Sequence, residues 1–87
     1  MRWNCVYVDE VRRFSFEVEE ESGRTFVAIP VRNQTVEYLE WYEVDEPTFW
    51  EYRADPSLAH EFVERCKRRE LDHLLLFQPG SDRGVAG

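Results

Sequence analysis

Residues 35–44, with the sequence TVEYLEWYEV, restrict the possible folds of this chain more than any other stretch. β-Branched and aromatic side chains dominate the stretch and no Gly or Pro interrupts it, which predicts a β-strand. One face of that strand would carry Val36, Tyr38, Glu40, Tyr42 and Val44, and the other Leu39 and Trp41 flanked by Glu37 and Glu43. Apolar groups on both faces are typical of a strand inside a sheet. We therefore expect a central strand, in which a buried Glu40 needs a partner such as Arg13, Arg24 or Arg32.

Three earlier segments, residues 3–8, 13–19 and 25–31, also predict strands. In the second of them Phe14, Phe16 and Val18 alternate with polar residues, which indicates a half-buried antiparallel strand with a wet outer face. Gly23 can adopt the positive φ of a turn, and Pro30 places its position at an edge, a bulge or a strand end. Short turns between successive strands predict a meander.

Two short helices are expected after the meander. Asp45 can cap the first, with Pro47 in its first turn, and the Asp55-Pro56 pair ends it and starts the second. The second helix has an apolar face made of Leu58, Ala59, Phe62, Val63 and Cys66, which we expect to pack on Phe14, Phe16 and Val18. Residues 74–77 form a short apolar run that predicts a buried last strand.

The predicted fold is α+β, an antiparallel β-meander of four to five strands with two helices packed on one face. One domain spans residues 1–80, and residues 81–87 are expected to be a flexible C-terminal tail.

The chain carries a formal charge of −7, and the excess acid is confined to one part of it. Residues 1–55 contain 13 acidic and 6 basic residues, whereas residues 56–87 contain five of each. Such a charge repels nucleic acid and attracts a basic protein. The alternative is that it only keeps the protein in solution by repulsion between copies. With no 18-residue apolar run, no signal peptide and two widely separated cysteines, we expect a cytoplasmic protein with no membrane association and two buried or half-buried thiols.

No catalytic or metal-binding pattern stands out. His60-Glu61 lacks the second histidine of a zinc helix, and His60 is expected to face solvent. Cys66 lies on the apolar face of its predicted helix, and Glu37 and Glu43 would be roughly 20 Å apart along one strand, too far for a carboxylate pair. We therefore predict no catalytic residues, no metal and no cofactor.

Aromatic and acidic residues alternate between positions 37 and 51, a pattern typical of a protein-binding surface or of an aromatic-rich core. The candidate partner-binding residues are Glu37, Tyr38, Trp41, Glu43, Glu46 and Trp50. The sequence favours a small acidic protein that binds and inhibits or regulates a basic partner, by analogy of size and charge with immunity proteins, antitoxins and phage inhibitors. The alternatives are a homo-oligomeric structural subunit, such as a homodimer, and a small ligand-binding protein without catalysis.

Overall fold

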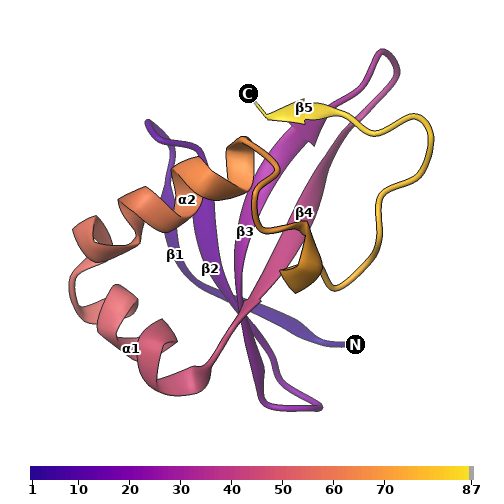
Figure 1. Ribbon diagram of the computed structural model, residues 1–87. Coiled ribbons are helices and arrows are strands. Elements are labelled where there is room, and N and C mark those ends of the chain that lie inside the picture. The colour runs from indigo at the N-terminus through magenta and orange to yellow at the C-terminus, as the bar shows by residue number, and fades with distance from the viewer. Residues whose placement is uncertain (87) are drawn as a thin grey trace.

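A computed structural model describes residues 1–86 and has the predicted α+β architecture (Figure 1). Four long strands form an antiparallel meander in the order β1-β2-β3-β4, and a fifth short strand, β5, pairs with β3. The strands are β1 (Trp3–Asp9), β2 (Phe14–Glu19), β3 (Arg24–Arg32), β4 (Glu37–Val44) and β5 (Val85–Ala86).

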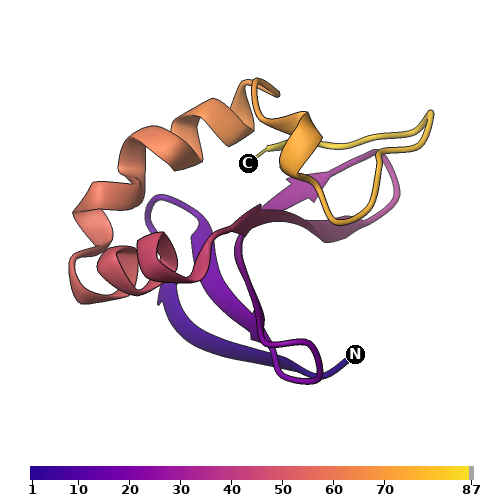
Figure 2. The same cartoon turned by 60° about the horizontal axis from the view of Figure 1, so that its bottom comes forward.

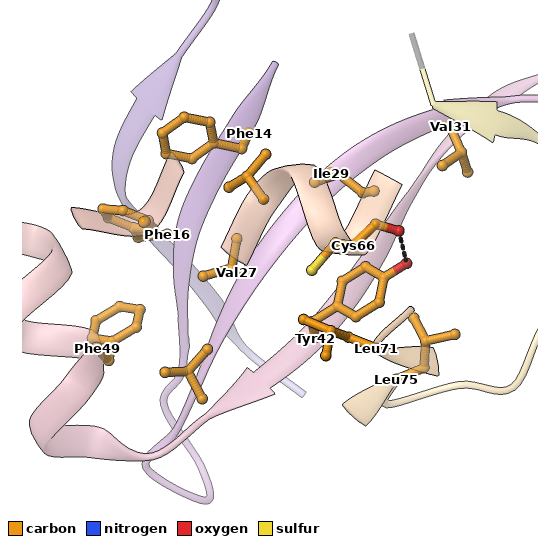
Figure 3. Packing of buried hydrophobic residues seen from close by; sticks show 13 residues of the cluster. Phe14, Phe16, Val27, Ile29, Val31, Tyr42, Phe49, Cys66, Leu71 and Leu75 are labelled. Atoms are coloured by element: carbon orange, nitrogen blue, oxygen red, sulfur yellow. Dashed lines mark hydrogen bonds between the residues drawn. The ribbon is translucent and has the colours of Figure 1, made fainter. Parts of the chain in front are cut away.

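The register of the strands assigns every side chain to one of two faces. Val27 on β3 is paired with Phe16 on β2 and with Tyr42 on β4, so these three side chains share one face. This face forms the core (Figure 3). Its buried members are Phe14, Phe16, Val27, Ile29, Val31, Tyr42, Val44, Phe49, Ala59, Val63, Cys66, Leu71 and Leu75.

Both helices contribute side chains to this core. Helix α1 (Glu46–Ala54) follows Asp45, has Pro47 in its first turn and buries Phe49. A 3-10 turn, η1 (Pro56–Ala59), is capped by Asp55 and leads into α2 (His60–Lys67), which buries Val63 and Cys66. The helix boundaries at Asp45 and Asp55-Pro56 are thus close to the expected ones, but His60 is half-buried with its ring against Phe14 rather than fully solvated.

The interior strands of the meander are β2 and β3, whereas β4 lies at its edge, so the expectation that residues 35–44 lie inside the sheet was wrong. β4 pairs with β3 along one edge only. Within residues 1–86 its outer edge carries one isolated bridge, between Leu75 and Tyr42, and the Leu76 amide donates to the Trp41 carbonyl at 2.9 Å. β4 has apolar groups on both faces because both faces are packed. Tyr42 and Val44 lie in the core, and Trp41 on the other face contacts the rings of Trp3 and Phe77.

Residues 74–77 do not form the predicted last strand. A 3-10 turn, η2 (Asp72–Leu74), occupies part of this run, and Phe77 is exposed. The fifth strand is β5, which pairs with Val31 and Arg32 beyond the point where β2 ends opposite Ala28. Pro30 lies between these two pairings, where its missing N–H removes no ladder hydrogen bond.

The outer face of β2 is buried, which contradicts the expected wet surface. Ser15, Glu17 and Glu19 are each at least nine-tenths buried. The pairing of β1 with β2 shifts register between Cys5 and Tyr7, a bulge that bends β1. The resulting curved sheet is visible in Figure 2.

Candidate functional site

The face of the sheet opposite the core is the candidate functional site, and we call it the second face. It consists of two rows of directly paired residues that cross all four long strands. One row is Cys5, Glu17, Phe26 and Glu43, and the other is Val8, Ser15, Ala28 and Trp41. Pro30 and Leu39, paired with each other, extend the face toward the end of β4.

Aromatic rings occupy one part of the second face. The Trp3 ring stacks on Trp41 with centroids 5.0 Å apart, and it also meets Phe26 edge-on at 5.2 Å. Phe77 approaches Trp41 from the loop after η2, at 6.1 Å, and remains 58% exposed. The indole N–H of Trp41 is buried with no acceptor among residues 1–86. Buried Trp N–H groups usually have a hydrogen-bond partner, so the unsatisfied donor in this aromatic group calls for an explanation.

A cavity of about 230 Å³ opens beside the aromatic group. Its lining includes the apolar side chains of Val8, Pro30 and Leu39 and the polar side chains of Ser15 and Glu17. Glu17 is only 7% exposed, and its carboxylate accepts a hydrogen bond of 2.8 Å from the Ser15 hydroxyl. Across residues 1–86, no Lys, Arg or His forms an ion pair with it. Burying a carboxylate without a cation destabilises the folded state, so the presence of Glu17 at this position calls for an explanation.

Two of the arginines beside the second face are already paired. Arg13 lines the cavity but donates to Glu37 at 3.0 Å, and Arg24 donates to both oxygens of Glu43 at 3.0 and 2.6 Å. The hydrogen bonds from Arg24 lower the pKa of Glu43 and keep it ionised. Neither arginine therefore neutralises Glu17.

Cys5 also lines the cavity and is exposed, contrary to the expectation that both thiols are at least half-buried. Partial desolvation, followed by the hydrogen bond to Glu17, raises the pKa of the Cys5 thiol above its ordinary value. A raised pKa disfavours the thiolate, the form required for nucleophilic attack.

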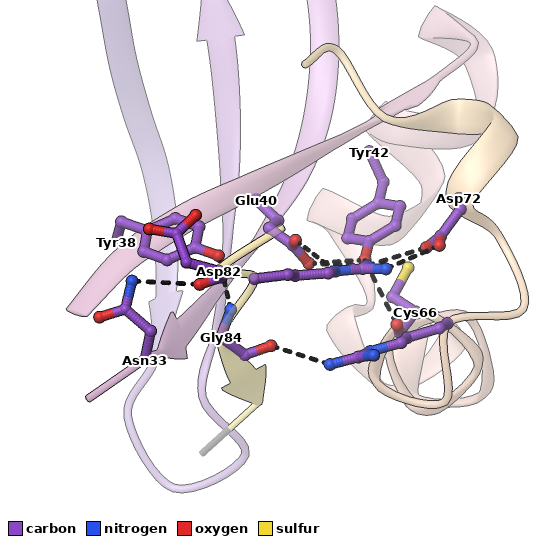
Figure 4. Close-up of polar contacts among 10 residues, drawn as sticks. Asn33, Tyr38, Glu40, Tyr42, Cys66, Asp72, Asp82 and Gly84 are labelled. Carbon is purple, nitrogen blue, oxygen red and sulfur yellow. Dashed lines mark hydrogen bonds and ion pairs between the residues drawn. The ribbon is translucent and has the colours of Figure 1, made fainter. Parts of the chain in front are cut away.

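A second polar cluster lies on the core side of β4, where Glu40 and Asp72 (Figure 4) both form ion pairs with Arg83. The Arg83 guanidinium donates to Glu40 at 2.8 and 3.1 Å and to Asp72 at 2.7 and 2.9 Å. Glu40 is thus buried, as its position among tyrosines suggested, but its partner is Arg83 instead of Arg13, Arg24 or Arg32. The pKa of Asp72 is lowered, first by the hydrogen bonds from Arg83.

Tyr42 connects this cluster to the core. Its hydroxyl lies 3.0 Å from Glu40 and 3.3 Å from the carbonyl of Cys66, both of which accept hydrogen bonds (Figures 3 and 4). Burial, followed by the negative charge of Glu40, raises the pKa of Tyr42. Because every charged group here has a partner, we assign the cluster a structural role.

Residues 83–86 of the expected tail are held by several contacts. The Gly84 amide donates to the Tyr38 hydroxyl at 2.7 Å, and the Gly84 carbonyl accepts from Arg69 at 3.1 Å. A Cβ on Gly84 would lie 2.6 Å from the carbonyl carbon of Arg32, so only glycine fits this close approach. The mobility of residues 81–87 stays a prediction.

The six candidate partner-binding residues do not form one surface. Glu37, Trp41 and Glu43 lie on the second face, with both glutamates in ion pairs. Tyr38 lies on the opposite face, and Glu46 and Trp50 lie on α1, where the Trp50 indole N–H donates to Glu46 at 3.4 Å. The residues that sequence reasoning missed are Cys5, Ser15 and Glu17. Alternation on β2 assigned Ser15 and Glu17 to the correct face but could not show that the curved sheet buries that face.

No protein-family model matches the chain, and the comparisons with curated proteins and with solved structures found no match. Within residues 1–86 there is no group of three or more His, Cys, Asp or Glu side chains arranged to hold a metal ion. None of the helices in the same residues is long and apolar enough to cross a membrane.

Proposed function

We propose that this protein is a binding module that inhibits or regulates a basic protein partner, and that the partner docks on the second face of the sheet. The observation that carries the proposal is Glu17, a nearly buried carboxylate in an open cavity that forms no ion pair with any described residue. A partner that supplies positive charge would remove the cost of burying it.

Two further features support docking on this face. Val8, Leu39 and Phe77 are large apolar side chains that the fold leaves exposed there. Leu39 borders both the Glu17 cavity and a neighbouring hollow of about 440 Å³ that Trp41 and Phe77 also line. Two adjoining hollows with aromatic walls can receive the anchor side chains that dominate most protein interfaces. The net charge of −7 would steer a basic partner toward the protein.

The proposal is tested by affinity capture from the native host's lysate, with the tagged full-length chain as bait. We expect one basic protein to be retained in stoichiometric amount at about 0.1 M salt and released at about 1 M, because the Debye length falls from about 10 Å to about 3 Å. The captured protein is then purified and its affinity for the bait is measured by calorimetry.

Two matched variants locate the interface. Phe77→Ser removes an exposed apolar group of the second face, and Leu58→Ser removes a comparably exposed one, 55% against 58%, from the turn between the helices. We expect the first to weaken binding about tenfold or more and the second to leave it unchanged. Equal effects would place the interface elsewhere, and a concentration-dependent mass with no captured partner would favour the homo-oligomer instead.

A further inference from the structure

We infer that the Glu17 cavity is the pocket for a lysine or arginine side chain of the partner. The inference rests on the proposed function and names the chemistry of the anchor that would enter this cavity. It follows from the charge, shape and free hydrogen-bonding capacity of the cavity.

The charge of the cavity is negative and incompletely neutralised. Three acidic residues line it, Asp9, Glu10 and Glu17, against one basic residue, Arg13. The carboxylate of Asp9 is occupied by the backbone N–H groups of Val11 and Arg12, at 3.0 and 2.8 Å. Because Arg13 is held by Glu37, the charge of Glu17 is left for an incoming cation.

Glu17 also has unused acceptor capacity. A carboxylate has about four lone-pair sites, and the Ser15 hydroxyl occupies one of them on Oε2. The thiol of Cys5 is a weak donor that contacts both Glu17 and the carbonyl of Tyr7. An ammonium or guanidinium group supplies the strong N–H donors that this carboxylate lacks, and charge-assisted hydrogen bonds of this kind are roughly twice as strong as neutral ones.

The walls of the cavity fit the rest of such a side chain. Lysine and arginine have apolar stems that pack along apolar surface while the charged head reaches a polar partner. Val8 and Leu39, both exposed, and the ring of Pro30 provide that surface next to Glu17. A carboxylate or phosphate ligand would instead be repelled by the three acids, and a purely apolar ligand would leave Glu17 desolvated and unpaired.

The test uses small probes in place of the unidentified partner. Acetylated and amidated arginine, lysine, citrulline and norleucine are titrated into the ¹⁵N-labelled full chain at constant ionic strength. We expect saturable amide shifts at Cys5, Ser15 and Glu17 with the two cationic compounds and none with the neutral pair. Alkylation of Cys5 should slow in parallel, because the thiol lines the same cavity.

The matched variants are Glu17→Gln and Glu61→Gln, the second of which removes an equal charge from the exposed side of α2. We expect Glu17→Gln to weaken binding of the arginine probe about tenfold or more, because the loss of a hydrogen bond to a charged group changes a binding constant by about that factor. Glu61→Gln should have no effect. If Glu17→Gln does not fold, Val8→Phe obstructs the cavity while leaving the carboxylate in place, and it should also abolish the shifts.

Shifts that persist in Glu17→Gln, or that spread evenly over the surface acids, would overturn the inference. The captured partner separates this failure from failure of the proposed function. Unchanged binding of the partner by Glu17→Gln, together with loss in Phe77→Ser, would disprove the lysine or arginine pocket and retain docking on the second face. Probe binding at Glu17 with no protein partner would disprove the proposed function and show a site for small cations.

Discussion

The guanidinium of Arg83 lies 2.8 Å from the carboxylate of Glu40, a residue 43 positions earlier in the chain. Arg83 is 10% exposed and Glu40 is 7% exposed, so the pair is shielded from water. The contact joins a residue near the C-terminus to an edge strand of the sheet, and the stability of the domain should depend on it.

Replacement of Arg83 by Met should destabilise the protein by about 3–5 kcal/mol, because it leaves the Glu40 charge buried without its partner. The free energy of unfolding from urea denaturation measures this loss. The double variant Arg83→Met with Glu40→Gln should recover part of it, since the amide is uncharged. A loss below about 1 kcal/mol for the single variant would mean that the ion pair contributes as little as an exposed one.

Gly84→Ala should destabilise the protein by about 1–3 kcal/mol, because its Cβ would overlap the backbone of Arg32 and push β5 away from β3. Gly80→Ala is the control, since its Cβ would meet only the Asp82 carboxylate, at an ordinary 3.4 Å. It should be neutral or stabilising by up to about 1 kcal/mol. Hydrogen exchange at Val85 and Ala86 should rise in the first variant only.

Glu19 should contribute to acid unfolding. Hydrogen bonds from Ser22 and from the amides of Arg2 and Glu21 lower its pKa from an ordinary 4.5 to about 2. Because the pKa of Glu19 is lower in the folded than in the unfolded state, its carboxylate stabilises the fold at pH values above the unfolded-state pKa. This stability should be lost as the pH falls from about 4.5 to about 2. Glu19→Gln should flatten the dependence of the unfolding free energy on pH in this window. Glu20→Gln, which removes an equal charge from the same turn, is the matched control.

The two cysteines should differ in reactivity. Cys5 is exposed, whereas Cys66 is buried and burial raises its pKa to about 12. Alkylation of the native protein at about pH 8 should add one group, at Cys5, and alkylation in denaturant should add two. Peptide mass spectrometry identifies the modified residue. Modification of Cys66 under native conditions at a rate near that of Cys5 would show that the core opens far more readily than its packing implies.

Local patterns predicted the strands of the meander and the helix boundaries. Each of these features depends only on residues close to it in the sequence. The predictions were correct for the alternation at Phe14 and Phe16, the turn at Gly23 and the boundary at Asp55-Pro56. The run at residues 74–77 was wrong as a strand because four apolar residues fit either a buried strand or a turn packed on the core.

The parts that sequence reasoning missed depend on contacts between distant residues. Nothing near Arg83 in the sequence indicates that it reaches Glu40, and nothing near Glu17 indicates that the bulge in β1 and the curvature of the sheet cover it. The candidate site was therefore assigned to the residues with the densest aromatic and acidic composition. The structure instead draws attention to one glutamate whose neighbours in space leave it without a cation.

The late position of Arg83 also has a consequence for the order in which the protein is made. At a synthesis rate of roughly 5–20 residues per second, a separation of 43 residues means that Glu40 leaves the ribosome's catalytic centre roughly 2–9 s before Arg83. Throughout that interval the acid between Tyr38 and Tyr42 lacks the cation that pairs with it in the folded domain. The nascent chain consequently passes through a stage in which Glu40, one of its buried acids, has no partner, and the arrival of a single arginine ends that stage.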